Sequence, residues 1–369
     1  MPMPLTTVVH TGHVSPLSLF YVLNMVILLL LITIGGEWLL WQWQHKKLHI
    51  PGDPPIGPRR LLTYGLGGLW LLDGLLQAQP AMVTRFIGGY LEPLVRSQPA
   101  FMIPMLHLGM HVWDLDPVGF NLAATWLQIG IGALMLLSGE SRWRRLALYI
   151  SIGWSLLVWS LGEAFGSLFA GGSWFLGSPG SALLYALLAL VLLCPAERWL
   201  RRDFHRVWQG GIAGLWWLAL SLQLWPRNGW WTSSAADYVR NMAVMPQPRL
   251  FSGPLYAWAT SLAAHPLGWN LALSLTLFIL ALAWSLRPPT LTLWTATFFF
   301  TLGSWTFGQD LGVLGGMGTD PNSGVVLLLA LVVYAWMAGL LPNHRTSSRL
   351  PREPKPDSPI AIVQEPFSN

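Results

Sequence analysis

Four carboxylate residues interrupt the apolar stretches of this 369-residue chain, namely Glu37, Asp73, Glu163 and Asp310. A charged side chain in hydrocarbon is costly, so such residues mark candidate ligand or proton-transfer sites. Gln77 follows Asp73 at i+4 and shares its helix face. Glu37 lies about six residues from one end of its apolar run and can reach the interface by snorkelling. The other three are the better candidates for chemistry.

Amide and aromatic residues recur at matched places in the two halves of the chain. The matching segments are 68–80 with 214–226, 117–123 with 266–272, and 159–166 with 305–312. The first and third pairs share one offset of 146 residues. Matched Trp, Gln, Pro and Asn residues are harder to obtain by chance than matched leucines. This pattern predicts an internal duplication.

The duplication sorts the polar candidates into pairs, which are Gln77 with Gln223, Asn121 with Asn270, and Glu163 with Gln309. Asp73 is matched by Ala219, so the first copy holds the charges and the second, apart from Asp310, does not. We therefore predict a polar, outward-facing cavity in the first copy, lined by Asp73, Gln77, Asn121 and Glu163. A plainer alternative is that the amides form interhelical hydrogen bonds, or that Asn121 and Asn270 cap helices.

A second group of candidates lies in the segment MIPMLHLGMH, 102–111. His107 and His111 are at i,i+4, with Met105 and Met110 beside them. Imidazole and thioether ligands suit copper, particularly Cu(I), and the same histidines would be the best haem ligands in the chain. The alternative is a short amphipathic helix that uses these side chains for packing.

The elements that hold these residues must be membrane helices. The chain is 53% hydrophobic and only 10% charged, with a mean hydropathy of +0.49. A soluble domain needs roughly 25% charged residues, so an ordinary soluble enzyme is excluded. One cysteine, Cys194, excludes an intrachain disulfide. The 23 tryptophans are typical of membrane–water interfaces.

Nine apolar stretches predict an all-α polytopic membrane protein. They are 17–43, 61–80, 118–138, 146–169, 180–195, 207–226, 267–286, 291–312 and 323–341. This arrangement places 16 of the 21 basic residues on one side, as the positive-inside rule requires, and the other five in two long loops on the opposite side. The chain is predicted to lie in the cytoplasmic membrane with its N-terminus outside and its C-terminus cytoplasmic.

The domain boundaries follow from the repeat. An N-terminal segment with the first helix and a linker (1–60) precedes two four-helix modules (61–195 and 207–341) and a polar, disordered tail (342–369). An even number of spans in each module makes the two repeats parallel. The long outer loops, 81–117 and 227–266, are amphipathic enough to form short interfacial helices.

Over 61–341 the span order and the segment RLLTYGLGGLWLLDGLLQ resemble the DoxX-like family of bacterial membrane proteins. The resemblance implies a four-helix fold in tandem. The family includes members linked to quinone and sulfur-compound oxidation. The cysteine pair of some redox members of related families is missing here, which excludes thiol chemistry.

These observations predict a membrane subunit or accessory protein that binds a small ligand or partner, and not an enzyme by itself. One alternative is a quinone-linked oxidoreductase subunit with an extracytoplasmic redox partner; another is an extracytoplasmic copper-handling protein. The segment GGMGTDPNSG, 315–324, lacks the Lys-Ser/Thr ending of a phosphate loop, so no ATP is expected. The basic residues set topology, so no nucleic-acid partner is expected either.

Overall fold

The computed structural model describes residues 15–44, 57–314 and 318–341, and all regular structure in these ranges is helical, with no strand. The predicted all-α class is confirmed. The predicted polar tail, most of the N-terminal segment and most of the first linker lie outside the described residues.

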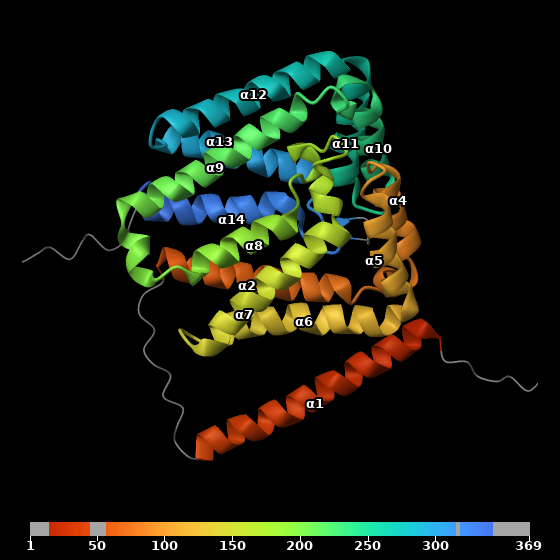
Figure 1. Cartoon of the computed structure of the whole chain (residues 1–369), viewed down its shortest axis with the longest axis vertical. Coiled ribbons are helices and arrows are strands. Elements are labelled where there is room, and N and C mark those ends of the chain that lie inside the picture. Colours follow the sequence, from red (N-terminus) through yellow and green to blue (C-terminus); the bar gives the residue numbers. More distant parts are fainter. Residues whose placement is uncertain (1–14, 45–56, 315–317, 342–369) are drawn as a thin grey trace, which may run out of the picture.

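Each of the nine predicted spans contains a helix, and these helices run side by side (Figure 1). They are α1 Pro16–Gln44, α2 Pro58–Gln77, α6 Pro117–Leu137, α7 Arg142–Leu157, α8 Ser181–Leu193, α9 Arg202–Gln223, α12 Pro266–Leu286, α13 Leu291–Phe307 and α14 Asn322–Met337. Among the described residues, α1, α6, α12 and the helix Arg142–Gly162 are long and apolar enough to cross a membrane. This is consistent with a membrane protein.

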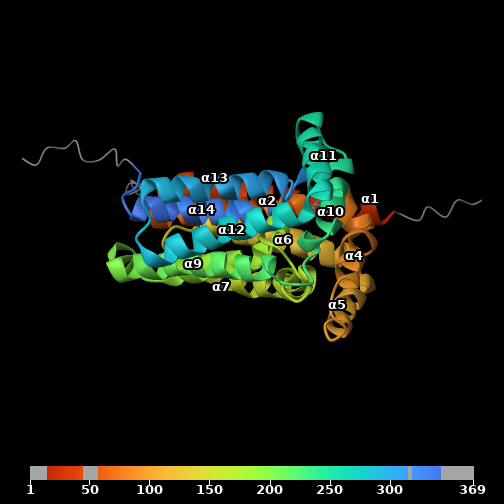
Figure 2. The same ribbon diagram turned by 90° about the horizontal axis from the view of Figure 1, so that it is seen from above.

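Five further helices are named the cap helices, and they are α3 Pro80–Thr84, α4 Glu92–Arg96, α5 Ile103–Leu115, α10 Ser234–Val244 and α11 Arg249–Ala264. Four of them, α4, α5, α10 and α11, lie crosswise at one end of the long helices (Figures 1 and 2). The cap helices come from the two long loops, and the amphipathic runs predicted there as short helices are helical. The face of α10 with Val239 and Met242 is buried, while Arg240 is exposed.

Local sequence signals explain where the long helices begin. Pro58, Pro117 and Pro266 stand in the first turns of α2, α6 and α12, where a missing backbone N–H costs nothing. The Ser141 hydroxyl caps α7 by accepting from Trp143 N, and the Thr290 hydroxyl caps α13 by accepting from Leu293 N. Such caps satisfy backbone donors that a helix start leaves unpaired.

Several tryptophan side chains pack in the core. Trp174, Trp216, Trp230 and Trp284 are fully buried. The indole N–H of Trp70 donates to Ser151 Oγ across two helices at 2.9 Å. Inside a bundle an indole buries a large apolar area and needs one acceptor, and Ser or Thr hydroxyl groups supply it for Trp70, Trp174 and Trp284.

The chain turns sharply after α7 and again after α13. The predicted span 146–169 ends earlier as a helix, at Gly162, because the next residues adopt left-handed backbone angles. The left-handed residues include Ala164, Phe165 and Gly166 in the first half, and Asp310, Leu311 and Gly312 in the second. The two sets are matched at the offset of 146 residues. Successive left-handed residues other than glycine are strained, so two matching turns of this kind are a specific shared feature.

Candidate functional site

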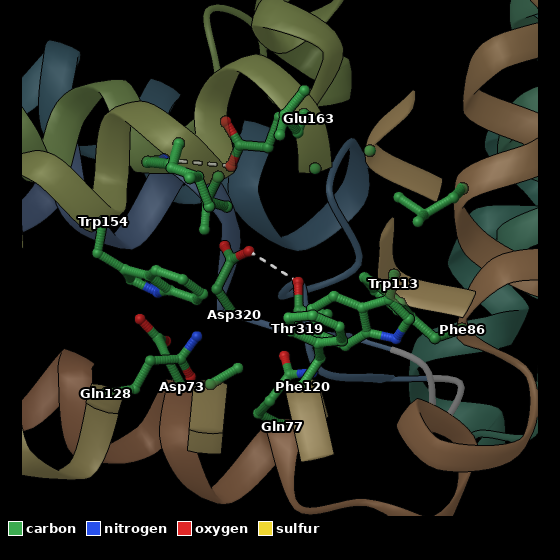
Figure 3. Close-up of a pocket in the computed structure, with 18 of the residues that line it drawn as sticks. Asp73, Gln77, Phe86, Trp113, Phe120, Gln128, Trp154, Glu163, Thr319 and Asp320 are labelled. Carbon is green, nitrogen blue, oxygen red and sulfur yellow. Dashed lines mark hydrogen bonds between the residues drawn. The ribbon is translucent and has the colours of Figure 1, made fainter. Parts of the chain in front are cut away.

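A cavity of about 500 Å³ lies where the long helices α2, α6, α8 and Arg142–Gly162 meet the cap helix α5. Its walls come from α2, α5, α6, α8 and the helix Arg142–Gly162, and from Thr319 and Asp320 just before α14. Figure 3 shows Asp320 and Thr319 between Glu163 on one side and Asp73 and Gln128 on the other. Of the predicted site residues, the cavity brings together Asp73, Gln77 and Glu163, with Met105 at its wall.

The three carboxyl groups of the cavity differ in their hydrogen bonds. Glu163 Oε1 accepts from Ser181 Oγ at 2.6 Å and from Ala182 N at 3.1 Å, which caps the start of α8. Asp320 Oδ1 accepts from Asn322 N at 2.6 Å. Asp73 is 2% exposed, and its Oδ1 has no hydrogen-bond donor among the described residues.

Burial changes the acid–base behaviour of the groups at the loop side of the cavity. It raises the pKa of the Asp320 carboxyl group from its ordinary value. Burial, followed by the charge of Asp320, raises the pKa of Tyr90 above its ordinary value, so this phenol stays protonated at neutral pH. Both shifts have the cause expected when a negative charge is moved out of water.

The predicted amides form interhelical pairs. Gln77 Nε2 donates to Asn121 Oδ1 at 2.5 Å, which joins α2 to α6. Gln223 Nε2 donates to Asn270 Oδ1 at 2.7 Å, which joins α9 to α12. The alternative of interhelical hydrogen bonds therefore describes these four residues, and only Gln77 also lines the cavity. Neither asparagine caps its helix, because the N-cap positions are Asp116 and His265.

Gln309 and Asp310 lie outside the cavity. Gln309 Oε1 accepts from Gly324 N at 2.8 Å, so this amide caps α14 as Glu163 caps α8. Asp310 Oδ2 accepts from Gln247 Nε2 at 3.0 Å. Gln309 and Asp310 therefore form hydrogen bonds within the second half and do not line the cavity.

The volume matching the cavity in the second half is filled with aromatic side chains. Trp174 packs against Trp216 with ring centroids 5.3 Å apart, and Phe175 packs against Phe300 at 5.6 Å. Both intruding rings come from the connection between α7 and α8. The residues matching Asp73, Gln128 and Tyr185 here are Ala219, Leu277 and Leu327. At these matching positions the second half therefore holds apolar residues and packed rings in place of polar groups.

The predicted metal ligands on α5 face different ways. His107 and His111 are exposed, whereas Met105 and Met110 are partly buried and pack against a small apolar cluster that includes Leu106. No group of three His, Cys, Asp or Glu side chains within the described ranges could hold a metal ion. The packing alternative describes the methionines.

Several residues of the cavity were missed by the sequence reasoning. Gln128 lies on the same face of α6 as Asn121, seven residues on, and that spacing was a usable signal. Tyr185 is the only phenol in an otherwise apolar helix, α8. Asp320 could not be found in this way, because it belongs to the second half and lines a cavity of the first.

No family model, curated protein or solved structure matches this chain. The arrangement itself shows what chemistry is available. Carboxyl groups and two phenols line a partly open cavity whose walls are mostly aromatic and aliphatic. Such a cavity suits binding of a small molecule with a polar end.

Proposed function

We propose that this chain is a multi-pass protein of the cytoplasmic membrane that binds a small ligand in the cavity of its first four-helix module. In this proposal nine helices span the bilayer, as one N-terminal helix and two parallel four-helix repeats of the DoxX-like type. The N-terminus is outside and the C-terminus cytoplasmic. The protein acts as a membrane subunit or accessory, and the cavity opens toward the outer side.

The observation that carries the proposal is the difference between the two halves. Matched residues make matched contacts: the indoles of Trp159 and Trp305 each donate to a proline carbonyl oxygen at 2.7 Å. Against that common background, the first half holds an open cavity with buried polar groups, and the second half holds packed rings. Buried polar atoms without partners cost stability. In the first half, Asp73, Gln128 and Glu163 keep such atoms at the wall of a cavity, which supports a ligand-binding role.

The charge distribution supports the proposed orientation. Arg59 and Arg144, at the starts of α2 and α7, pair with Glu140 at the end away from the cap helices. The cap helices carry Arg96 and Arg240, which pair with acidic residues on their own helices. The cavity, next to the cap helices, then faces the outer side.

Filling the cavity tests this function. Leu161 lines the cavity, and we expect Leu161→Trp to exclude a bound molecule without removing any hydrogen bond. Wild-type protein purified in lipid nanodiscs should carry a small molecule that native mass spectrometry detects, and the variant should lose it. Leu200→Trp, at a position 87% exposed and outside the cavity, is the matched control. Equal small-molecule content in Leu161→Trp and wild type, or none in wild type, would overturn the proposal.

A further inference from the structure

The cavity holds three carboxyl groups and no basic side chain. Asp73, Glu163 and Asp320 line it, and its lining includes no Lys, Arg or His. None of the three forms an ion pair within the described part of the chain. A carboxylate removed from water needs a positive partner or a proton. A cationic ligand would supply that partner.

Three buried acceptor atoms at the cavity wait for donors. Asp73 Oδ1, Gln128 Oε1 and Glu163 Oε2 have no hydrogen-bond donor among the described residues. The side chains of Asp73 and Gln128 are 2% and 6% exposed, so bulk water does not serve them. Each unfilled acceptor of this kind costs about 1–3 kcal/mol. A protonated primary amine carries N–H donors for acceptors of this kind.

The walls of the cavity favour an organic cation over a hydrated ion. Trp70, Trp113, Phe120 and Trp154 present aromatic rings to it, and a cation is attracted to the face of such rings. A volume of about 500 Å³ is far larger than a metal ion needs and fits a small organic molecule. The absence of a three-ligand cluster within the described ranges points the same way.

We propose that the cavity binds a protonated primary amine carried on an apolar body, with the ammonium group among the carboxyl groups of Asp73, Glu163 and Asp320 and the apolar part against the tryptophans. This inference rests on the proposed ligand-binding function and names its ligand class. The second half, with Ala219, Leu277 and Gln309 at the matching positions, would not bind such a ligand.

A pair of isosteric probes separates charge from shape. Wild-type protein in nanodiscs of zwitterionic lipid is titrated with 2-phenylethylamine and with 2-phenylethanol, and binding is followed by calorimetry and by tryptophan fluorescence. We expect the amine to bind at least about tenfold more tightly than the alcohol, because the alcohol brings one donor and no charge. Phenylacetate, an anion of similar size, should not bind.

Two variants locate the ammonium group. Asp73→Asn should weaken amine binding about tenfold or more. Glu163→Gln keeps the acceptor that caps α8, as Gln309 does for α14, so it should fold normally and also weaken amine binding several-fold. Asp310→Asn, which lies outside the cavity and contacts Gln247, is the control and should bind the amine as wild type does.

The outcomes that would overturn the inference differ from those for the proposed function. Equal affinity for amine and alcohol, or amine affinity unchanged in both Asp73→Asn and Glu163→Gln, would overturn the amine assignment. A cavity that takes the alcohol alone would do the same, while the ligand-binding function would stand. That function fails only if the Leu161→Trp comparison shows no loss of bound molecule.

Discussion

At the scale of single residues, the ionisation of the Asp320 carboxyl group gives a direct experimental test. It precedes α14 in the chain yet lines a cavity made by α2, α6 and α8, and burial raises the pKa of its carboxyl group. Its oxygens accept from Asn322 N and from the Thr319 hydroxyl at 3.2 Å. These hydrogen bonds favour the charged form but do not outweigh the burial.

The raised pKa of Asp320 predicts a stability that falls as pH increases. Above the ordinary carboxyl pKa of about 3.9, the folded protein holds this proton more tightly than the unfolded chain does, so the free energy of unfolding decreases until the folded-state pKa is passed. Asp320→Asn removes that dependence. We expect the midpoint of thermal unfolding of Asp320→Asn, relative to wild type, to be higher at pH 7 than at pH 4. Parallel pH curves would contradict this; Asp237→Asn, at an exposed position on α10, is the control.

At the scale of elements, the two connections after the left-handed turns decide which half has a cavity. From Gly166 to Pro179 the first connection spans 13 residues, and from Gly312 to Pro321 the matching one spans 9, a difference of four. The longer connection carries the 3-10 helix Trp174–Leu176 into the second half, where Trp174 donates to Ser304 Oγ at 2.8 Å. The shorter one brings Thr319 and Asp320 to the first half, and space remains.

Removing the indole ring of Trp174 should leave a void among the helices of the second half. Trp174 is fully buried, and Trp174→Ala leaves a void of an indole's size, which costs about 3–5 kcal/mol of unfolding free energy. Unfolding by sodium dodecyl sulfate in mixed micelles measures this loss. Trp225→Ala, at a side chain 46% exposed, should change stability by about 0.5 kcal/mol or less. A Trp174→Ala protein as stable as the Trp225→Ala protein would contradict the role assigned to this ring.

The matched left-handed turns give a second test at this scale. At Gly166 and Gly312 a Cβ would stand 2.0 Å from Pro179 O and 2.4 Å from Pro321 C, and both residues have positive φ angles. Gly166→Ala and Gly312→Ala should therefore each lower the thermal midpoint, with strain of about 1–3 kcal/mol or more.

Two helical glycines that are also 146 residues apart supply the matched controls. A Cβ at Gly68 or Gly214 would meet nothing within 4 Å, so Gly68→Ala and Gly214→Ala should leave the midpoint unchanged or raise it slightly. Tolerance of alanine at only one of the two turns would show that the halves do not use this feature alike.

At the scale of the whole molecule, the basic helix starts and the cavity lie at opposite ends of the long helices. The cap helices and the cavity share one end of the long helices, and the basic starts of α2, α7 and α9 share the other (Figure 1). In the proposed orientation, the basic helix starts lie on the cytoplasmic side, as the positive-inside rule predicts, so the cavity lies toward the outer side. A ligand would then reach it from outside without crossing the bilayer.

Cysteine labelling tests that orientation. In a Cys194→Ala background, Ser233→Cys lies at the start of α10 and Arg202→Cys at the start of α9, and both positions are exposed. A membrane-impermeant maleimide should label Ser233→Cys on intact cells and Arg202→Cys only after lysis. Labelling of Arg202→Cys on intact cells would reverse the proposed topology.

The sequence alone was enough for the all-helical class, the approximate position of each long helix and the grouping of Gln77 with Asn121 among the candidate residues, because these depend on hydropathy and on spacing along one chain. It also identified Asp73 and Glu163, since a carboxylate within an apolar run is a local signal. It could not show that the Asn121 side chain is hydrogen-bonded to Gln77 and does not line the cavity. Nor could it show that the histidines of α5 are exposed while its methionines are partly buried. Only the tertiary structure brought Asp320 to Asp73 and Glu163 and sent Trp174 into the second half. These contacts join residues far apart in the chain, and their occurrence depends on how two bundles pack, which no periodicity in either bundle encodes.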